Sequence, residues 1–413
     1  METPVLDNPT FKAAVASRKA GHNIIVGWTD SADNIPTDLW KKCFGAQAEG
    51  LWWYRCLENA HLEDQFKFLY GVIYDTTNGG AQPIGIVPAF LMDVPMELVA
   101  PEFFMNFLKM VAPFVPGALY QRTLFVGSPC ADEGTIGLLS GYSLRQIVPY
   151  LQKELELKGR QLKVAIVAYK DFGGQQAKAL DSLTEAKSTF APGSLFTTVS
   201  YPGTRVSLPP GGFESYLASL KSSRRHNLRK KLKRSKEKIA LSYEVIQFPN
   251  EEVLEETFAL FWQTYEHGKT KFERLTKTFF RSIAKEPTSY YVLLRRQDNN
   301  RLVAFMLCFK FGDKIINKFI GLDYEQAEEW HLYFRLWEAA VTWAQSISAR
   351  EIQSGQTGYR AKTDLGHDLV PLTNYCKHLN PLIHCLYAHL AKDITMSSLD
   401  EDLATFLKAH PEG

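Results

Sequence analysis

Apolar residues alternate with polar ones, or recur every three to four positions, along most of this 413-residue chain. Alternation and short apolar runs predict strands, whereas the longer spacing predicts helices. In the first half, the predicted strands are 23–29, 66–75, 83–94, 123–129 and 162–169, and the predicted helices are 51–62, 101–114, 143–159 and 173–186. The turn-rich TTNGGAQ joins two of these strands as an antiparallel hairpin, and helices separate the later strands. We therefore expect a mixed sheet covered by helices.

The second half follows the same order. Helices are predicted at 213–238, 251–268, 276–285 and 331–348, strands at 240–248 and 351–355, and a three-strand meander over 290–323. No sequence identity links the halves, so an internal repeat is inferred from pattern alone. The predicted fold class is α/β with mixed sheets.

The length of the chain favours two domains over one. The segment 194–212 contains Pro209-Pro210-Gly211-Gly212, which interrupts regular structure, and we interpret it as a linker. The predicted boundaries are an N-terminal domain at 1–193, a C-terminal domain at 213–390, and a helical tail at 391–413.

The formal net charge is only +2, but the positive charge is concentrated in one place. Ten of the eighteen residues from Lys221 to Lys238 are Lys or Arg and one is acidic, while the rest of the chain carries 37 basic and 44 acidic residues. This distribution indicates a local patch rather than a generally basic, histone-like protein.

The cysteines and the N-terminus exclude several classes of protein. The six cysteines are far apart and form no CxxC pair, which argues against a zinc site or a disulfide framework and favours a reducing compartment. The N-terminus METPVLDNPTFKAA does not resemble a signal peptide, and no apolar run approaches the length of a membrane span. These features predict a cytoplasmic protein with no metal and no membrane span.

The basic run lies on a predicted helix with an apolar stripe at Leu217, Leu220, Leu228 and Leu232, which would dock it in a fixed orientation. The run contains almost no acidic residues, so i,i+4 ion pairs within it do not account for the charge. Arginine binds phosphate in a bidentate manner, and we predict an anion site. Its residues are Arg224, Arg225, Asn227, Arg229 and Lys230. General RNA binding is less favoured because the run has no interleaved aromatic residues.

The stretch SSRRHNLRKKLKR, followed by the strand LSYEVI, resembles the basic helix of the Fem-type tandem GNAT transferases, with matching positions at Arg224, Asn227, Arg229 and Lys230. Residues 123–138, 261–280 and 321–366 resemble further segments of such proteins. The resemblance implies two tandem GNAT-like domains. It also implies transfer of an acyl or aminoacyl group to an amine of a small molecule or peptide, in a cleft between the domains.

The resemblance leaves the donor open among acyl-CoA, a carrier-protein thioester and aminoacyl-tRNA. Enzymes that use acyl-CoA typically carry Gln/Arg-x-x-Gly-x-Gly/Ala where a strand enters a helix. The nearest partial match, Arg18-Lys19-Ala20-Gly21, precedes a strand instead. We expect no tightly bound cofactor, with acyl-CoA or aminoacyl-tRNA as co-substrate and tRNA or an acyl carrier protein as alternative partners.

Acyl transfer to an amine requires a positioned amine, a proton acceptor and donors for the tetrahedral oxyanion. His331 at the start of a helix is one candidate acceptor, and a helix-start residue facing water is the alternative interpretation. Tyr265 and His267 lie in a segment that the resemblance places near the cleft, with core packing and solvent exposure as their respective alternatives.

A second candidate region is SGQTGYRAK, which follows a predicted strand end where ligands bind in open sheets. Its glycines, including Gly358, allow the backbone to approach a ligand closely. Gln356 is a candidate binding residue, and Tyr359 and Lys362 are candidate catalytic residues.

Two other classes of protein compete with a transferase. Ser128 lacks a GxSxG elbow and Cys130 has no evident His partner, so a hydrolase is rejected. A non-catalytic protein that keeps the fold and binds RNA or another phosphate-bearing ligand through the basic run remains the alternative.

Overall fold

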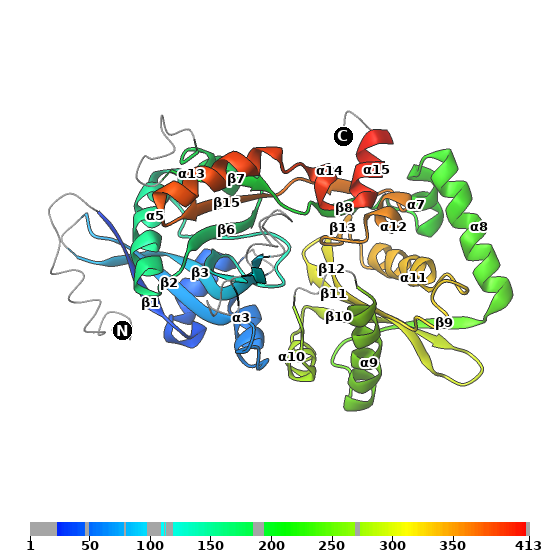
Figure 1. Cartoon of the computed structure of the whole chain (residues 1–413). Helices are drawn as coiled ribbons and strands as arrows, with labels where there is room; N and C mark the ends of the chain where they lie inside the picture. Colours follow the sequence, from blue (N-terminus) through cyan, green and yellow to red (C-terminus); the bar gives the residue numbers. More distant parts are fainter. Residues whose placement is uncertain are drawn as a thin grey trace. The chain divides into compact units, whose positions relative to one another are not determined.

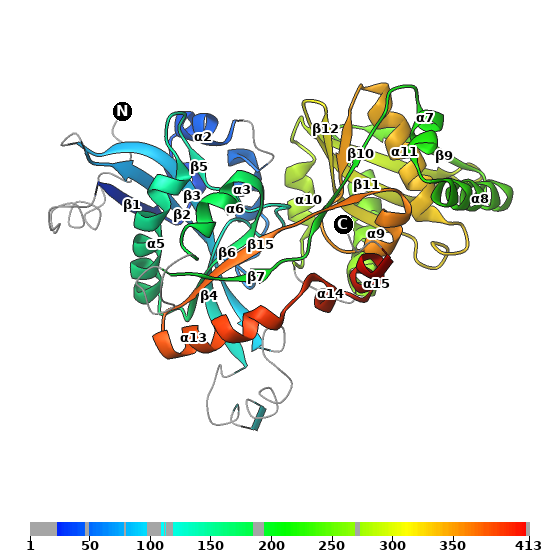
Figure 2. The same ribbon diagram turned by 90° about the horizontal axis from the view of Figure 1, so that it is seen from above.

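A computed structural model describes residues 23–45, 49–77, 80–96, 109–110, 112, 119–184, 194–268 and 273–409. Most of the predicted helix 101–114, and the Arg18–Gly21 segment, lie outside the described residues. The chain forms two compact units (Figures 1 and 2). Unit 1 contains the chain up to Glu58, Leu62–Ser200 and Leu372–Thr395; unit 2 contains Asn59–His61, Tyr201–Pro371 and the chain from Met396 onwards. Within the described ranges, no helix has the length and apolar character needed to cross a membrane.

The sheet of unit 1 has the strand order β1-β2-β3-β4-β6-β15-β7, with β5 added against β3. Its strands are β1 Ile24–Thr29, β2 Lys67–Asp75, β3 Gln82–Pro95, β4 Tyr120–Val126, β5 Gly137–Leu138, β6 Ile166–Phe172, β7 Phe196–Val199 and β15 Thr373–His378. Strands β1 to β4 are antiparallel neighbours, whereas β4 and β6 are parallel. The parallel pair is joined by the helix α5, Leu144–Gln161, which supplies the crossover that parallel strands require.

The sheet of unit 2 has the order β14-β8-β13-β12-β11-β10-β9. Its strands are β8 Gly203–Ser207, β9 Leu241–Ile246, β10 Ser289–Arg296, β11 Leu302–Phe311, β12 Lys314–Leu322, β13 Glu351–Gln353 and β14 Asp368–Val370. The meander β10-β11-β12 is antiparallel, and β12 and β13 are parallel, joined by α11, Leu332–Ser346. The two units therefore share a topology of antiparallel strands, a crossover helix and a parallel strand, and the predicted mixed α/β class with two sheets is confirmed.

The remaining helices lie between these strands or follow them. They are α2 Thr37–Phe44, α3 Leu51–Glu58, α6 Gly174–Asp181, α7 Phe213–Ser219, α8 Ser222–Lys238, α9 Glu251–His267, α10 Lys277–Ile283, α12 Tyr359–Asp364, α13 Pro381–Leu390, α14 Met396–Leu399 and α15 Glu401–Ala409. The predicted helix 213–238 is two helices, because Leu220 has extended backbone angles that end α7 before α8 begins.

The structure corrects the predicted domain boundaries. The segment 194–212, predicted to be a linker, supplies β7 to the sheet of unit 1 and β8 to that of unit 2. Strand β15, predicted to lie in the C-terminal domain, pairs with β6 and β7 of unit 1. The chain thus passes from one sheet to the other twice. These strands are short and flanked by Pro and Gly, and their partners are remote in sequence, so local pattern cannot assign them.

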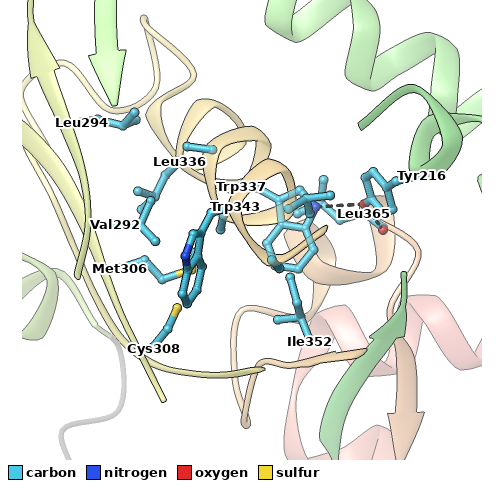
Figure 3. Packing of buried hydrophobic residues seen from close by; sticks show 14 of the residues in the cluster. Tyr216, Val292, Leu294, Met306, Cys308, Leu336, Trp337, Trp343, Ile352 and Leu365 are labelled. Atoms are coloured by element: carbon cyan, nitrogen blue, oxygen red, sulfur yellow. Dashed lines mark hydrogen bonds between the residues drawn. The ribbon is translucent and has the colours of Figure 1, made fainter. Parts of the chain in front are cut away.

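The core of unit 2 is built on α11, whose inner face packs on the meander (Figure 3). Trp337 is fully buried, and its Nε1 donates to the hydroxyl of Tyr216, 2.9 Å away. The Tyr216 hydroxyl in turn donates to the carbonyl of Leu365 at 2.6 Å. This chain of hydrogen bonds satisfies the two polar side chains that the core encloses and ties α7 to α11 and to the end of α12.

Candidate functional site

The basic helix α8 is docked on unit 2 as its leucine stripe predicts. Leu217, Leu220, Leu228 and Leu232 are all buried in the core cluster. Ser235 is also buried, donating to the carbonyl of Trp330 at 2.6 Å and accepting from Arg335 Nη1 at 3.3 Å. The opposite side of α8 is exposed along its length. The direction in which the helix displays its charge is therefore fixed by the fold.

Half of the basic residues in the run have acidic partners, and most of these partners come from other elements. The ion pairs are Arg229–Glu214 at 2.6 Å, Lys231–Asp364 at 3.4 Å, Lys233–Glu237 at 3.9 Å, Lys236–Glu338 at 2.7 Å and Lys238–Glu329 at 3.1 Å. Arg225 Nη1 instead donates to the carbonyls of Ala218 and Leu220 at the end of α7. One of these five pairs, Lys233–Glu237, lies within the run, whereas the other four involve acidic residues outside it, which the composition of the run does not reveal. Predicted anion-site residues Arg225 and Arg229 are engaged within the protein.

A smaller set of cations remains available for a ligand. Apart from Arg225, the cations of the run that form no ion pair among the described residues are Lys221, which precedes α8, and three on the helix itself, Arg224, Lys230 and Arg234. Together with the exposed amide of Asn227, the three on the helix are separated by three or four positions, which places them on one side of the helix. We call these four residues the basic strip. It extends over about 15 Å at a rise of ~1.5 Å per residue.

His331 lies beside the C-terminal half of α8. It is the residue preceding α11, in the left-handed region with φ 50°, and it is partly buried. Burial lowers the pKa of His331, and the positive charges of Lys231, Arg234 and Lys238 lower it further. The imidazole is therefore favoured in its neutral form, which can accept a proton. Of the predicted proton acceptors, this is the one that the structure places beside cations of α8.

The parallel strands β12 and β13 diverge at a defined point. They pair from Lys314↔Glu351 to Ile316↔Gln353, after which β12 continues to Leu322 along β11 alone. At this point the register of β11 with β12 shifts: Cys308 faces Asn317 and Leu307 faces Phe319, with Lys318 between. Such β-bulges redirect side chains and interrupt the ladder of backbone hydrogen bonds.

A buried polar cluster lies where these strands diverge. Ser354 follows β13, and its Oγ lies 3.1 Å from His367 Nε2 and 3.5 Å from Asn317 Nδ2. The other nitrogen of His367, Nδ1, lies 2.9 Å from the carbonyl of Lys362, so it carries the proton, and Nε2 accepts from the Ser354 hydroxyl. Burial lowers the pKa of His367 to about 3, with a smaller contribution from Lys362. This histidine is neutral at physiological pH and too weakly basic to act as a general base there.

The predicted catalytic residues of the 354–362 loop are buried and donate to backbone carbonyls. The Lys362 ammonium is buried and donates to the carbonyl of Ser354, to that of Gly355 at 3.3 Å and to that of Gln356 at 3.0 Å. Tyr359 is fully buried, and its hydroxyl donates to the carbonyl of Pro202 at 2.9 Å.

The two predicted binding residues of this loop are Gly358 and Gln356. Gly358 precedes α12 and has φ 65°, in the left-handed region that favours glycine. This backbone conformation accounts for a glycine at position 358 whether or not a ligand binds there. The Gln356 side chain has a buried Nε2 with no hydrogen-bond partner in the part of the chain that is described. Gln356 is thus the one predicted residue of the loop with an unused polar atom.

Tyr265 and His267 lie at the C-terminal end of α9, which is attached to the far end of β12. Leu322 N donates to Thr264 Oγ1 at 3.2 Å. The ring of His267 stacks on Tyr324 with centroids 4.1 Å apart, and that of Tyr265 lies 5.2 Å from Trp262. Tyr265 and His267 therefore lie near the end of β12, whereas Ser354 and His367 lie where β13 ends.

Sequence reasoning missed Arg234, Asn317 and His367. Arg234 follows from the helical spacing of the basic run once the ion-paired residues are removed. Asn317 lies in an apolar strand and His367 stands in the unremarkable stretch LGHDLV, so no motif or periodicity marks either residue.

Comparison with known proteins connects this geometry with a family. Residues 211–382 match the FemAB-like family, described as peptidoglycan biosynthesis/recognition. This protein carries a FemAB-like domain. The match covers α8, the meander, α11 and the 354–362 loop. The predicted Fem-type relationship is confirmed on this part of the chain. No curated protein sequence matches this chain.

Three solved structures illustrate what the whole chain is similar to. L-PGS from Bacillus licheniformis is 11% identical with a TM-score of 0.47, over 82% of this chain and 92% of that one. FemX is 12% identical with a TM-score of 0.48, over 81% and 93%. A tandem GNAT protein from the clavulanic acid biosynthesis pathway is 10% identical with a TM-score of 0.43, over 76% and 84%. Similarities of this size carry no inference about donor, acceptor or catalytic residues.

Proposed function

We propose that this protein transfers an acyl or aminoacyl group from an activated, phosphate-bearing donor to an amine, and that the basic strip binds the donor phosphates. The observation that carries the proposal is the strip itself: Arg224, Lys230 and Arg234 are unpaired among the described residues and stand on one side of a docked helix of the FemAB-like domain. Arginine and lysine in such an array bind phosphate oxygens through charge-assisted hydrogen bonds.

The length of the strip favours one class of donor. Its cations extend over about 15 Å, which suits a chain of successive phosphates better than one diphosphate group. An aminoacyl-tRNA, held near its acceptor end, is therefore favoured over acyl-CoA or a carrier-protein thioester. The family description names peptidoglycan, so a peptide amine is the acceptor class to test first.

The reaction itself needs few side chains. The amine nitrogen attacks the donor carbonyl, a C–N bond forms, the C–O bond of the aminoacyl ester (or the C–S bond of a thioester) breaks, and the amine proton ends on the leaving group. His331, held neutral beside Lys231 and Arg234, is the proton acceptor that we assign. Backbone N–H groups at the β12 bulge are the candidate oxyanion donors.

A transfer assay with labelled donors tests the proposal. The purified protein is incubated with amine acceptors, including peptidoglycan-type peptides, and with either charged tRNA or labelled acetyl-CoA. We expect transfer from charged tRNA. Replacing Lys230 and Arg234 together by Ala should raise the donor KM by about tenfold or more while kcat changes little, since charge-assisted bonds worth ~1.5–3 kcal/mol are lost.

A matched control lies on the same helix. Lys233 is exposed on the other flank of α8 and pairs with Glu237. Lys233→Ala removes one positive charge away from the strip, whereas Lys230→Ala removes one from it, so Lys233→Ala should leave the donor KM unchanged. Equal effects of the two changes would mean that α8 acts only through its net charge. Salt-sensitive RNA binding without transfer from either donor would favour the non-catalytic alternative.

A further inference from the structure

Helix α13 of unit 1 exposes an apolar stripe. Leu382, Leu386 and Leu390, at positions i, i+4 and i+8, are 75%, 54% and 36% exposed, and Ile383 is 36% exposed. Ile394, in the segment that follows the helix, is 39% exposed. Of the exposed positions of α13, His389 alone is polar. We call these five apolar residues the α13 stripe.

The orientation of α13 is fixed by polar contacts on its inner side. His384 is buried, and its Nδ1 accepts from the backbone N–H of His378 in β15 at 3.3 Å. The Tyr387 hydroxyl accepts from Gln121 Nε2 in β4 at 3.2 Å. The helix packs against β15 and β7 of unit 1, and Figure 1 shows it next to β15. The usual arrangement of an amphipathic helix is reversed here, with a histidine inward and leucines outward.

We propose that the α13 stripe inserts into the surface of a phospholipid bilayer. The five side chains present on the order of 400 Å² of apolar surface, about half of the ~800 Å² that each partner of a stable protein interface buries. A helix lying in the bilayer interface requires only one apolar face of this size. The proposal is independent of the transferase activity.

The charges around the stripe are compatible with lipid headgroups. No Asp or Glu occurs between Asp368 and Asp393, so the helix carries no carboxylate that would be desolvated or repelled at a bilayer. His389 and Lys392 are exposed beside the stripe and can contact phosphates of the headgroups.

Sedimentation with vesicles of neutral phosphatidylcholine in 0.5 M salt tests the proposal. Neutral lipid and high salt suppress binding through the cations of α8, so that apolar insertion is measured. The full-length protein should sediment with the vesicles, and Leu386→Glu should weaken this binding at least tenfold. Leu382→Gln, at the most exposed position, provides a second variant with the same expected direction.

Unit 1 offers a matched control. Leu157 on α5 is 55% exposed, against 54% for Leu386, so Leu157→Glu makes the same change at an equally exposed site outside the stripe and should leave vesicle binding unchanged. The proposal is overturned if the unaltered protein stays in solution or if both glutamate variants bind equally. It is also overturned if light scattering shows a dimer that Leu386→Glu dissociates, because the stripe is then a protein interface.

Discussion

His367 holds the hydroxyl of Ser354 inside unit 2, with Nε2 3.1 Å from Oγ and Nδ1 2.9 Å from the carbonyl of Lys362. Both side chains are buried, at 1% and 4% exposure. The two hydrogen bonds determine the tautomer of the histidine and attach the end of β13 to the turn after α12. Since the pKa of His367 is about 3, the pair serves structure and positioning rather than proton transfer at neutral pH.

The Ser354–His367 pair should behave as a coupled unit in stability measurements. Ser354→Ala and His367→Phe each leave a buried polar group without its partner, and each should reduce the free energy of unfolding by about 1–3 kcal/mol. The double variant should lose less free energy of unfolding than the two single variants together, as measured by urea unfolding. Ser346→Ala is the control, because the Ser346 hydroxyl bonds only the nearby carbonyl of Trp343. Additive losses would show that the contact contributes nothing of its own.

The free energy of unfolding should fall as the pH is lowered below the pKa of histidine in the unfolded chain. Burial holds the pKa of His367 at about 3 and that of His384 at about 4, both below the 6.5 of an unperturbed histidine. The unfolded chain therefore binds protons that the folded chain does not, so this stability is complete above pH 6.5 and is lost as the pH falls from there towards the folded pKa values. From pH 6.5 to 5, His367 alone should account for about 2 kcal/mol.

Thermal or urea unfolding at several pH values measures this slope. His367→Phe should flatten this pH dependence, whereas Ser346→Ala, which removes no titratable group, should leave it unchanged. An unchanged pH dependence in the His367 variant would mean that folding does not lower the pKa of this histidine.

Lys362→Met should act on stability, not on chemistry. The methionine keeps the volume of the side chain but leaves the carbonyls of Ser354, Gly355 and Gln356 without the buried ammonium. We expect a loss of about 1–3 kcal/mol in unfolding free energy. If instead kcat falls by orders of magnitude with no change in the melting temperature, Lys362 is catalytic, as the sequence had suggested.

His331 should determine the acidic limb of the pH–rate profile. The pKa of His331 is lowered by burial and by the charges of Lys231, Arg234 and Lys238. The imidazole therefore stays neutral at a lower pH than an unperturbed histidine does, and kcat should stay constant down to that pH. His331→Gln should reduce kcat about 10²-fold or more and remove this limb. Arg234→Ala should shift the limb towards higher pH, since one of the charges that lower the pKa is gone. An unaltered profile in His331→Gln would assign the proton transfer to another group.

Local pattern predicted most of the elements of this fold. The alternation in YYVLLRRQDNNRLVAFMLCFKFGDKIINKFIGLD corresponds to β10, β11 and β12, and the stripe Leu217, Leu220, Leu228 and Leu232 is the buried side of α7 and α8. Both depend on residues within a few positions of one another, which a single sequence displays directly. The strands β7, β8 and β15 were missed because each is short and acquires its identity from a partner far along the chain.

The sequence by itself determined that this chain has mixed sheets with helices, a docked basic helix and a Fem-type character. Only the tertiary structure decided which cations of α8 are available, because the partners Glu214, Asp364 and Glu338 approach from separate elements. It also decided that Tyr359 and Lys362 are buried and donate hydrogen bonds to backbone carbonyls, and that Ser354 forms a hydrogen bond with His367. Periodicity records which face of an element is apolar, whereas ion pairs and buried hydrogen bonds depend on which elements meet in space.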